Sequence, residues 1–258
     1  MRHALAGSAL LFSLVSGCGP SKAASRDTTS ASTPSKRALR PARVATADSA
    51  MVVSASALAT NAGLDVLRHG GNAVDAAVTV ALTLAVTYPA AGNIGGGGFM
   101  VAHINGKNVA LDFREMAPRA ATRDMYLDSA GNMTDRSVTG ALASGVPGSV
   151  AGLYEAHKKY GTKPWAELVR PAMELAERGF VLDTSFTDGE FLDDDESGAQ
   201  RLAKDSASAA LFLRNGKFVP VGDTWRAPEL AAVLRRISEK GRDGFYRAAT
   251  ADLIVNAM

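Results

Sequence analysis

Residues 92–114 read GNIGGGGFMVAHINGKNVALDFR, with a run of glycines near its start and an Asn-Gly pair in its middle. Four consecutive glycines precede a strand-like run, Asn105-Gly106 is a tight hairpin signal, and residues 108–114 supply the returning strand. Glycines ahead of a strand indicate backbone that passes close to another group or takes φ values that other residues avoid. A phosphate-binding loop would need a helix after the glycines and a Gly-Lys-Ser/Thr sequence, and neither follows here. The stretch therefore predicts a β-hairpin entered through a glycine-rich segment.

Helical patterns lie on both sides of the hairpin. The segment between Ser56 and Gly70 has helical spacing of its apolar residues. Asn72 can cap the next helix, with Asp75 in its first turn, where a negative charge suits the helix dipole. That helix, 73–86, is apolar or small on nearly every face, so we expect it to be buried between layers.

Other elements follow from spacing, proline and glycine. The expected set is a short strand at 51–54, a helix at 149–159, two short helices within 164–178 divided by Pro171, a helix opened by Thr224 or Ala227 and stopped by Gly241, and a helix from Phe245 to Met258 that is cut off mid-pattern. Alternating helices and strands predict an α/β (α+β) fold, and the ending suggests a truncated chain.

Composition excludes several classes of protein. The 258 residues are 47% hydrophobic and 21% charged, which is typical of a globular chain, and the net charge of +2 gives no reason to expect nucleic acid. One cysteine excludes an internal disulfide framework, and the four histidines have no metal-ligand spacing. The acidic run 193–196 lacks the alternating oxygen ligands of a calcium loop, so a solvated loop is expected. Neither a metal nor a cofactor is therefore predicted.

The N-terminal residues have the pattern of a secretory signal. A positive start is followed by an apolar run, 4–16, that is too short to span a bilayer. The run ends at Val15-Ser16-Gly17-Cys18, which resembles the lipobox of bacterial lipoproteins, in which the cysteine carries the lipid. An ordinary signal peptide with an incidental cysteine is the alternative. We expect a lipoprotein signal peptide at 1–17, and a lipidated Cys18 followed by a flexible Ser-, Thr- and Pro-rich tether at 18–47.

The best candidate for chemistry is Asp112-Phe113-Arg114-Glu115, at the end of the returning strand. Strand ends project side chains into clefts, and a guanidinium there can bind a carboxylate through two parallel hydrogen bonds. The plainer interpretation is that Arg114 pairs with Asp112 or Glu115 at the surface. The residues by themselves leave both interpretations open.

Five motifs in order resemble the large subunit of the γ-glutamyltransferases. They are residues 70–77 (GGNAVDAA), 89–100 (PAAGNIGGGGFM), 112–118 (DFREMAP), 143–152 (ASGVPGSVAG) and 222–224 (GDT). The resemblance covers the part expected to fold, 48–258, and implies an incomplete large-subunit domain. The fold it implies is a partial αββα sandwich of the N-terminal-nucleophile hydrolase type, truncated, with an apolar edge left uncovered.

The resemblance also implies a function. In the family, a precursor cuts itself into two subunits, and a threonine at the start of the small subunit attacks the γ-glutamyl amide of glutathione to form an acyl-enzyme. The family's carboxylate-binding arginine falls on Arg114. The chain stops before the position of the processing site, so no catalytic residue is expected within it. The implied partners are glutathione or other γ-glutamyl compounds, and a small subunit that carries the threonine.

Three functions remain open at this point. The first is the N-terminal part of a γ-glutamyltransferase or glutathione hydrolase, lipid-anchored in a bacterial cell envelope, whose isolated chain would be inactive. The second is a related acylase that acts on glutaryl-type side chains; the presence of Arg114 favours a substrate with a free α-carboxylate. The third is a non-catalytic lipoprotein fragment, or a partner of a separately encoded small subunit.

Overall fold

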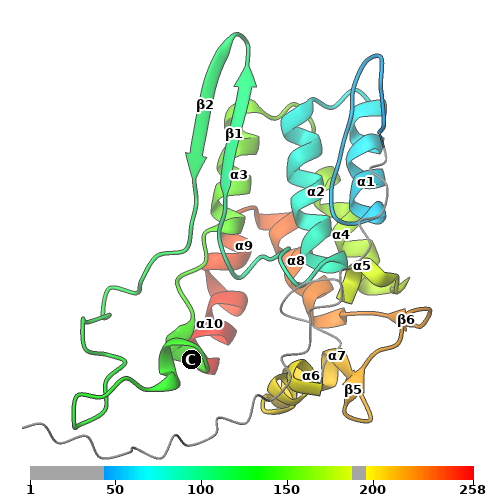
Figure 1. The fold of residues 1–258 in the computed structure, drawn as a ribbon. Coiled ribbons are helices and arrows are strands. Elements are labelled where there is room, and N and C mark those ends of the chain that lie inside the picture. Colours follow the sequence, from blue (N-terminus) through cyan, green and yellow to red (C-terminus); the bar gives the residue numbers. More distant parts are fainter. Residues whose placement is uncertain (1–43, 188–195) are drawn as a thin grey trace, which may run out of the picture. The chain divides into compact units, whose positions relative to one another are not determined.

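The structure is a computed structural model that describes residues 44–187 and 196–258 (Figure 1). The expected signal peptide, Cys18 and most of the expected tether and acidic run lie outside the described residues. Within the described part, no helix has both the length and the apolar character needed to cross a bilayer.

Helices are the main regular elements of the described part. Their bounds are α1 Ala57–Arg68, α2 Ala73–Thr87, α3 Ser149–Tyr160, α4 Trp165–Arg178, α5 Thr184–Thr187, α6 Glu196–Ala203, α7 Ser206–Phe212, α8 Pro228–Lys240, α9 Asp243–Tyr246 and α10 Ala248–Ala257, with 3-10 turns at Asp135–Ser137 and Ala141–Ala143. The strands are β1 Phe99–Ile104, β2 Lys107–Asp112, β3 Phe180–Val181, β4 Leu213–Arg214, β5 Lys217–Phe218 and β6 Thr224–Trp225.

Helix α2 is the centre of the helical packing. It contacts α1, α3 and α4, while α4 also packs against α8 (Figure 1). Val78, Leu82 and Val86 are fully buried, and the hydroxyl of Thr83 donates to the carbonyl of Thr79 within the helix. A helix buried on several faces is what its apolar sequence predicts.

The start of α2 confirms the expected cap. The side chain of Asn72 accepts hydrogen bonds from the N–H groups of Val74 and Asp75, and the carboxylate of Asp75 accepts from the N–H of Asn72 at 2.9 Å. Asp75 is fully buried and also accepts from the backbone and hydroxyl of Thr162, so it ties α2 to the connection between α3 and α4.

The expected hairpin is formed by β1 and β2. The two strands pair antiparallel, with Phe99 opposite Asp112 and Ile104 opposite Lys107. Asn105 and Gly106 both have positive φ, as a two-residue hairpin turn of the primed type requires. Strand β2 ends at Asp112, before the expected end at Arg114.

The two faces of the hairpin differ. Met100, Ile104 and Leu111 pack against the helical core, and Figure 1 shows the hairpin beside α3. Phe99 and Val101 point to the other face and are 65% and 84% exposed. Each sheet of the described residues has two strands, so no third strand there pairs with β1 or β2.

Two other expected helices are also present. The helix expected at 149–159 is α3, and the helix with Pro228 in its first turn is α8, whose N-cap is Ala227 and not Thr224. Gly241 follows α8 with positive φ, which agrees with its expected role as a stop.

The strand expected at 51–54 does not form. Val52 and Ser54 are partly buried and Met51 and Val53 exposed, so exposure alternates as in a strand, but no described strand pairs with the segment. The hydroxyl of Ser54 instead bonds to the carbonyl of Ser56 and the hydroxyl of Thr60, which fixes the segment against α1. Alternating exposure is therefore not sufficient to form a β-strand when no neighbouring strand is available for pairing.

The expected division of 164–178 at Pro171 is also wrong, because α4 is one continuous helix with Pro171 inside it. A proline removes one backbone hydrogen bond, at a cost of about 3 kcal/mol. Leu168, Val169, Ala172 and Ala176 lie on one face across the proline and are all buried, and their packing against α2 and α8 offsets that cost.

The single helix expected from Phe245 to Met258 is two helices. Arg247 is extended and Ala248 has φ 51°, so the chain changes direction between α9 and α10. The hydroxyl of Thr250 donates to the carbonyl of Gly244 and accepts from the guanidinium of Arg236. These hydrogen bonds stabilise the change of direction between α9 and α10. The apolar pattern of the sequence does not predict this change.

Candidate functional site

The site around Arg114 is built where three segments distant in sequence meet. The glycine-rich segment pairs with the end of the hairpin, because Gly98 and Phe113 exchange backbone hydrogen bonds of 3.0 and 3.4 Å. It also meets the start of α3, because the carbonyl of Gly96 accepts from the N–H groups of Gly148 and Ser149 at 2.7 and 3.0 Å. The motifs at 92–98, 112–118 and 143–152 are therefore one structural unit.

A second bridge lies on the other side of Arg114. Met116 and Val146 exchange backbone hydrogen bonds of 2.7 and 3.2 Å. The backbone of Arg114 is consequently held two residues after it by Val146 and one residue before it by Gly98.

None of the four glycines requires an unusual φ value, and Gly97 and Gly98 allow two chain segments to approach closely. None of Gly95, Gly96, Gly97 or Gly98 has positive φ. A Cβ on Gly97 would lie 2.6 Å from the Cα of Arg114, and one on Gly98 would lie 2.8 Å from the ring of Phe113. Of the two explanations open from the sequence, the structure thus selects the close passage of backbone past another chain segment.

Asn93 links the glycine-rich segment to α3. Its side-chain oxygen accepts a hydrogen bond of 2.9 Å from the N–H of Gly96 and one of 2.6 Å from the hydroxyl of Ser149. Ser149 is buried at the first position of α3. Sequence reasoning missed both residues, although Asn and Ser beside glycines are residue types that bond to backbone.

Phe113, the residue before Arg114, packs closely against the start of α3. A Cβ on Gly152 would overlap its ring, and a Cβ on Gly148 would overlap its carbonyl oxygen. The end of β2 therefore lies so close to α3 that a residue with a Cβ would not fit at Gly148 or Gly152.

Arg114 is exposed and lines an open pocket of about 410 Å³. Its backbone N–H donates to the carboxylate of Asp112 at 3.0 Å, in a turn that takes the chain out of the strand. No described residue makes an ion pair or hydrogen bond with its guanidinium. The plainer interpretation, in which Arg114 pairs with Asp112 or Glu115, is thus absent from the described structure.

Two other charged residues of this pocket have charged partners, while the carboxylate of Asp112 accepts from the backbone N–H of Arg114. Glu155 pairs with Lys159 at 3.1 Å, and Arg242 lies 3.6 Å from the carboxylate of Asp243 and 4.9 Å above the ring of Tyr246. Arg114 is the cation of the pocket that has no charged partner within the described residues, which suits it to an external carboxylate.

Tyr246 also lines the pocket. Its hydroxyl donates to the carbonyl of Pro147 at 2.9 Å and accepts from the N–H of Ala151 at 3.2 Å. Burial raises the pKa of Tyr246, while the N–H of Ala151 and the charge of Arg242 oppose this rise in part. The phenol therefore stays protonated at neutral pH and can donate.

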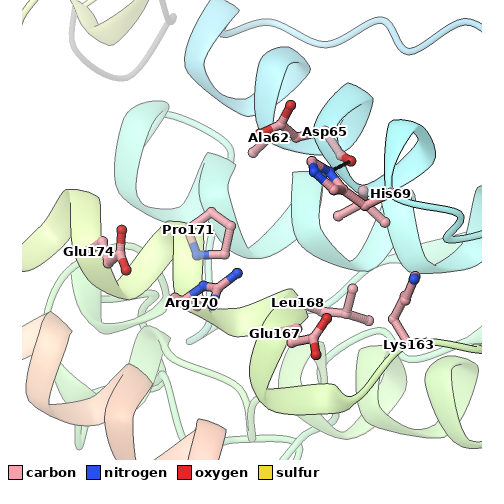
Figure 2. Close-up of a pocket in the computed structure, with 10 residues that line it drawn as sticks. Ala62, Asp65, His69, Lys163, Glu167, Leu168, Arg170, Pro171 and Glu174 are labelled. Carbon is pink, nitrogen blue, oxygen red and sulfur yellow. Dashed lines mark hydrogen bonds between the residues drawn. The ribbon is translucent and has the colours of Figure 1, made fainter.

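The described residues also line pockets elsewhere. One of about 400 Å³ lies between α1 and α4, and Figure 2 shows side chains of both charges around it, among them Asp65, Lys163, Glu167 and Arg170. A second, of about 370 Å³, is mostly apolar and lies between α10 and residues 118–147. Within the described residues, no three His, Cys, Asp or Glu side chains form a metal-binding group.

Comparison with protein families and curated proteins identifies relatives. The Gamma-glutamyltranspeptidase family matches residues 59–258. The chain is 47% identical over 215 residues to a glutathione hydrolase proenzyme of Pseudomonas sp. (strain A14), covering 82% of this chain and 36% of the relative. It is also 47% identical over 210 residues to that of Escherichia coli (strain K12), covering 81% and 36%. The chain thus spans about a third of the length of these relatives.

Solved structures agree with this match. The γ-glutamyltranspeptidase of Helicobacter pylori superposes with a TM-score of 0.78 at 42% identity, covering 84% of this chain and 61% of that one. The enzyme of Pseudomonas nitroreducens, complexed with L-DON, gives 0.74 at 43% identity, covering 83% and 61%. The expected mixed fold, part of an N-terminal-nucleophile hydrolase, is thereby confirmed, and the chain belongs to the γ-glutamyltranspeptidase family.

Proposed function

We propose that this chain supplies the carboxylate-binding part of a γ-glutamyltransferase, or glutathione hydrolase, that cleaves γ-glutamyl amides. One observation carries the proposal: Arg114 is held between two backbone bridges and lines a pocket, and its guanidinium has no charged partner among the described residues. Membership of the family makes a γ-glutamyl compound such as glutathione the natural source of the carboxylate.

Arg114 would act by binding and orientation. A planar guanidinium can donate two parallel hydrogen bonds to the α-carboxylate of the γ-glutamyl group. Fixing that end of the substrate leaves the γ-amide carbonyl at a set distance and direction, so part of the orientational entropy is lost on binding and not in the chemical step.

The chemical step requires a nucleophile from another segment. In the proposed reaction, a threonine hydroxyl of a small subunit attacks the γ-carbonyl carbon, a C–O bond forms, and the C–N bond breaks as the amine leaves with a proton. Water or an acceptor amine then attacks the ester and restores the hydroxyl. The described residues of this chain bind and orient the glutamyl group throughout.

We further propose that the protein is anchored in a bacterial cell envelope through a lipid on Cys18. The support is the position of this cysteine, the only one in the sequence, at the end of a short apolar run. Radiolabelled palmitate should enter the wild-type protein in a bacterial host and not the Cys18→Ser variant. Equal labelling of both proteins would contradict the anchor.

An assay with three chromogenic amides tests the proposed activity. The precursor, expressed from the gene that encodes this chain, should release nitroaniline from γ-glutamyl-p-nitroanilide, more slowly from glutaryl-p-nitroanilide, which lacks the amine, and slowest from 4-aminobutyryl-p-nitroanilide, which lacks the carboxylate. The 258-residue chain by itself should release none. No turnover by the precursor would contradict the proposal, and a preference for the glutaryl substrate would indicate the related acylase activity.

A further inference from the structure

The start of α3 has no hydrogen bond from the side chain of its N-cap residue. Its N-cap is Gly148, which offers no side chain to the free N–H groups of the first turn. Any larger residue there would overlap the carbonyl oxygen of Phe113. The close approach of the hairpin end to α3 thus excludes Ser, Thr, Asp and Asn from this position.

Tyr246 replaces the missing cap from another helix. Its hydroxyl, at the end of α9, accepts from the N–H of Ala151 in the first turn of α3 and donates to the carbonyl of Pro147 just before that helix. Both groups lie more than ninety positions away along the sequence. One phenol therefore closes the turn from 147 to 151.

That turn also determines where Arg114 lies. The N–H of Gly148 bonds to Gly96 in the glycine-rich segment, whose Gly98 pairs with Phe113, and Val146 pairs with Met116. The backbone after Arg114 is consequently fixed to Val146, which precedes Pro147. The backbone before Arg114 is fixed to Gly98, two positions after the Gly96 that binds Gly148.

We propose that Tyr246 is a positioning residue for Arg114: through Pro147 and Ala151 it holds the turn that fixes the backbone of the carboxylate-binding arginine. This inference rests on the proposed function for its kinetic consequence. Its structural consequence, tighter backbone around 113–116, is independent of any activity.

Tyr246→Phe removes the hydroxyl and keeps the ring, and Tyr154→Phe is the matched control. Tyr154 packs its ring edge-on against Trp165, at 5.0 Å between centroids, and its hydroxyl makes no hydrogen bond with a described residue. In the 258-residue chain, hydrogen exchange at the amides of Met116 and Gly148 should become at least fivefold faster in Tyr246→Phe and stay within twofold in Tyr154→Phe. Unchanged exchange in Tyr246→Phe, or the same change in both variants, would overturn the inference.

The kinetic test uses the precursor and two substrates. The ratio of kcat/KM for γ-glutamyl-p-nitroanilide to that for 4-aminobutyryl-p-nitroanilide should fall at least fivefold in Tyr246→Phe, mainly through KM for the γ-glutamyl substrate, and should stay within twofold in Tyr154→Phe. A loss of folded protein lowers both rates equally and leaves this ratio unchanged. An unchanged ratio in Tyr246→Phe would refute the positioning role. If the wild-type precursor turns over neither substrate, the proposed function fails, while the exchange measurement still decides what Tyr246 holds.

Discussion

At the scale of single residues, the absence of side chains matters as much as their presence. Four glycines face the segment 113–115: Gly148 just before α3, Gly152 in α3, and Gly97 and Gly98 before β1. A Cβ at any of them would meet that segment at closer than normal contact distance. Gly95, in the same glycine run, has no atom within 4 Å of an added Cβ and has no positive φ. Gly148 and Gly95 both have φ values that other residues adopt, and they differ in how closely other atoms surround them.

That difference gives a paired prediction. Gly148→Ala should lower the free energy of unfolding of the chain by about 1–3 kcal/mol, because the methyl group forces the end of β2 away from α3. Gly95→Ala should change it by less than about 0.5 kcal/mol, as exposed substitutions do. Urea denaturation of both variants checks this. Equal stability of the two would show that the close contact of Gly148 is not a constraint.

Only part of the candidate site could be predicted from individual residues of the sequence. The type and order of residues at 112–115 indicated a carboxylate-binding arginine, but the same residues allowed an ion pair with Asp112 or Glu115. Only the three-dimensional arrangement removes that pair within the described residues. Tyr246 had no signal near Arg114 in the sequence, because its partners Pro147 and Ala151 come from a distant segment.

At the scale of elements, the start of α2 joins local and long-range structure. The capping box of Asn72 and Asp75 is local, while the same carboxylate of Asp75 accepts from the N–H of Thr162 at 2.9 Å and from its hydroxyl at 2.6 Å. Burial raises the pKa of Asp75, but the hydrogen bonds from Thr162, Asn72 and Lys163 together lower it by more than burial raises it. The pKa of Asp75 is therefore below its ordinary value. The folded state thus favours the charged carboxylate.

This linkage predicts both a pH dependence and a mutant effect. A carboxyl whose pKa is lower in the folded state stabilises the protein above its unfolded pKa of about 3.9, and this stabilisation is lost as the pH falls from there through the folded pKa. Asp75→Asn should cost about 1–3 kcal/mol at pH 7, because an amide group then faces buried N–H donors. The variant should also lose less stability than the wild type between pH 6 and pH 3.

Asp65→Asn is the matched control for this prediction. Asp65 is exposed and lies 3.6 Å from Arg68 in a surface pair. Such pairs contribute about 0–1 kcal/mol, so the control should keep both the stability and its pH dependence. Chemical denaturation across the pH series would contradict the role of Asp75 if its variant behaved like the control.

Elements with strong local signals could be predicted from the sequence. The cap at Asn72, the proline at the start of α8 and the turn at Asn105-Gly106 act within a few residues, so their helices and hairpin occur where expected. The strand expected at 51–54 fails for want of a neighbouring strand, and the division expected at Pro171 fails because buried packing across it offsets the lost hydrogen bond. Both predictions were wrong because the outcome depends on contacts with segments distant in sequence, which a local pattern does not describe.

At the scale of the whole molecule, the chain is a partial assembly of a known fold. It covers 36% of the length of two curated relatives, and its hairpin exposes Phe99 and Val101 on the face away from the helices. The layered fold could be expected only through resemblance to the family, because periodicity gives elements but not their order in a sheet. The site described here is correspondingly one wall, with Arg114 at its surface.

The most direct test is the KM of the precursor for γ-glutamyl-p-nitroanilide after Arg114→Lys. A lysine keeps the charge but cannot form two parallel hydrogen bonds, and the loss of about 1.5–3 kcal/mol corresponds to a rise in KM of roughly ten- to a hundredfold. The value for 4-aminobutyryl-p-nitroanilide, which has no carboxylate, should stay within about twofold of wild type if the variant is folded. Arg114 as the carboxylate-binding residue predicts this selective rise. An unchanged KM for the γ-glutamyl substrate would contradict it.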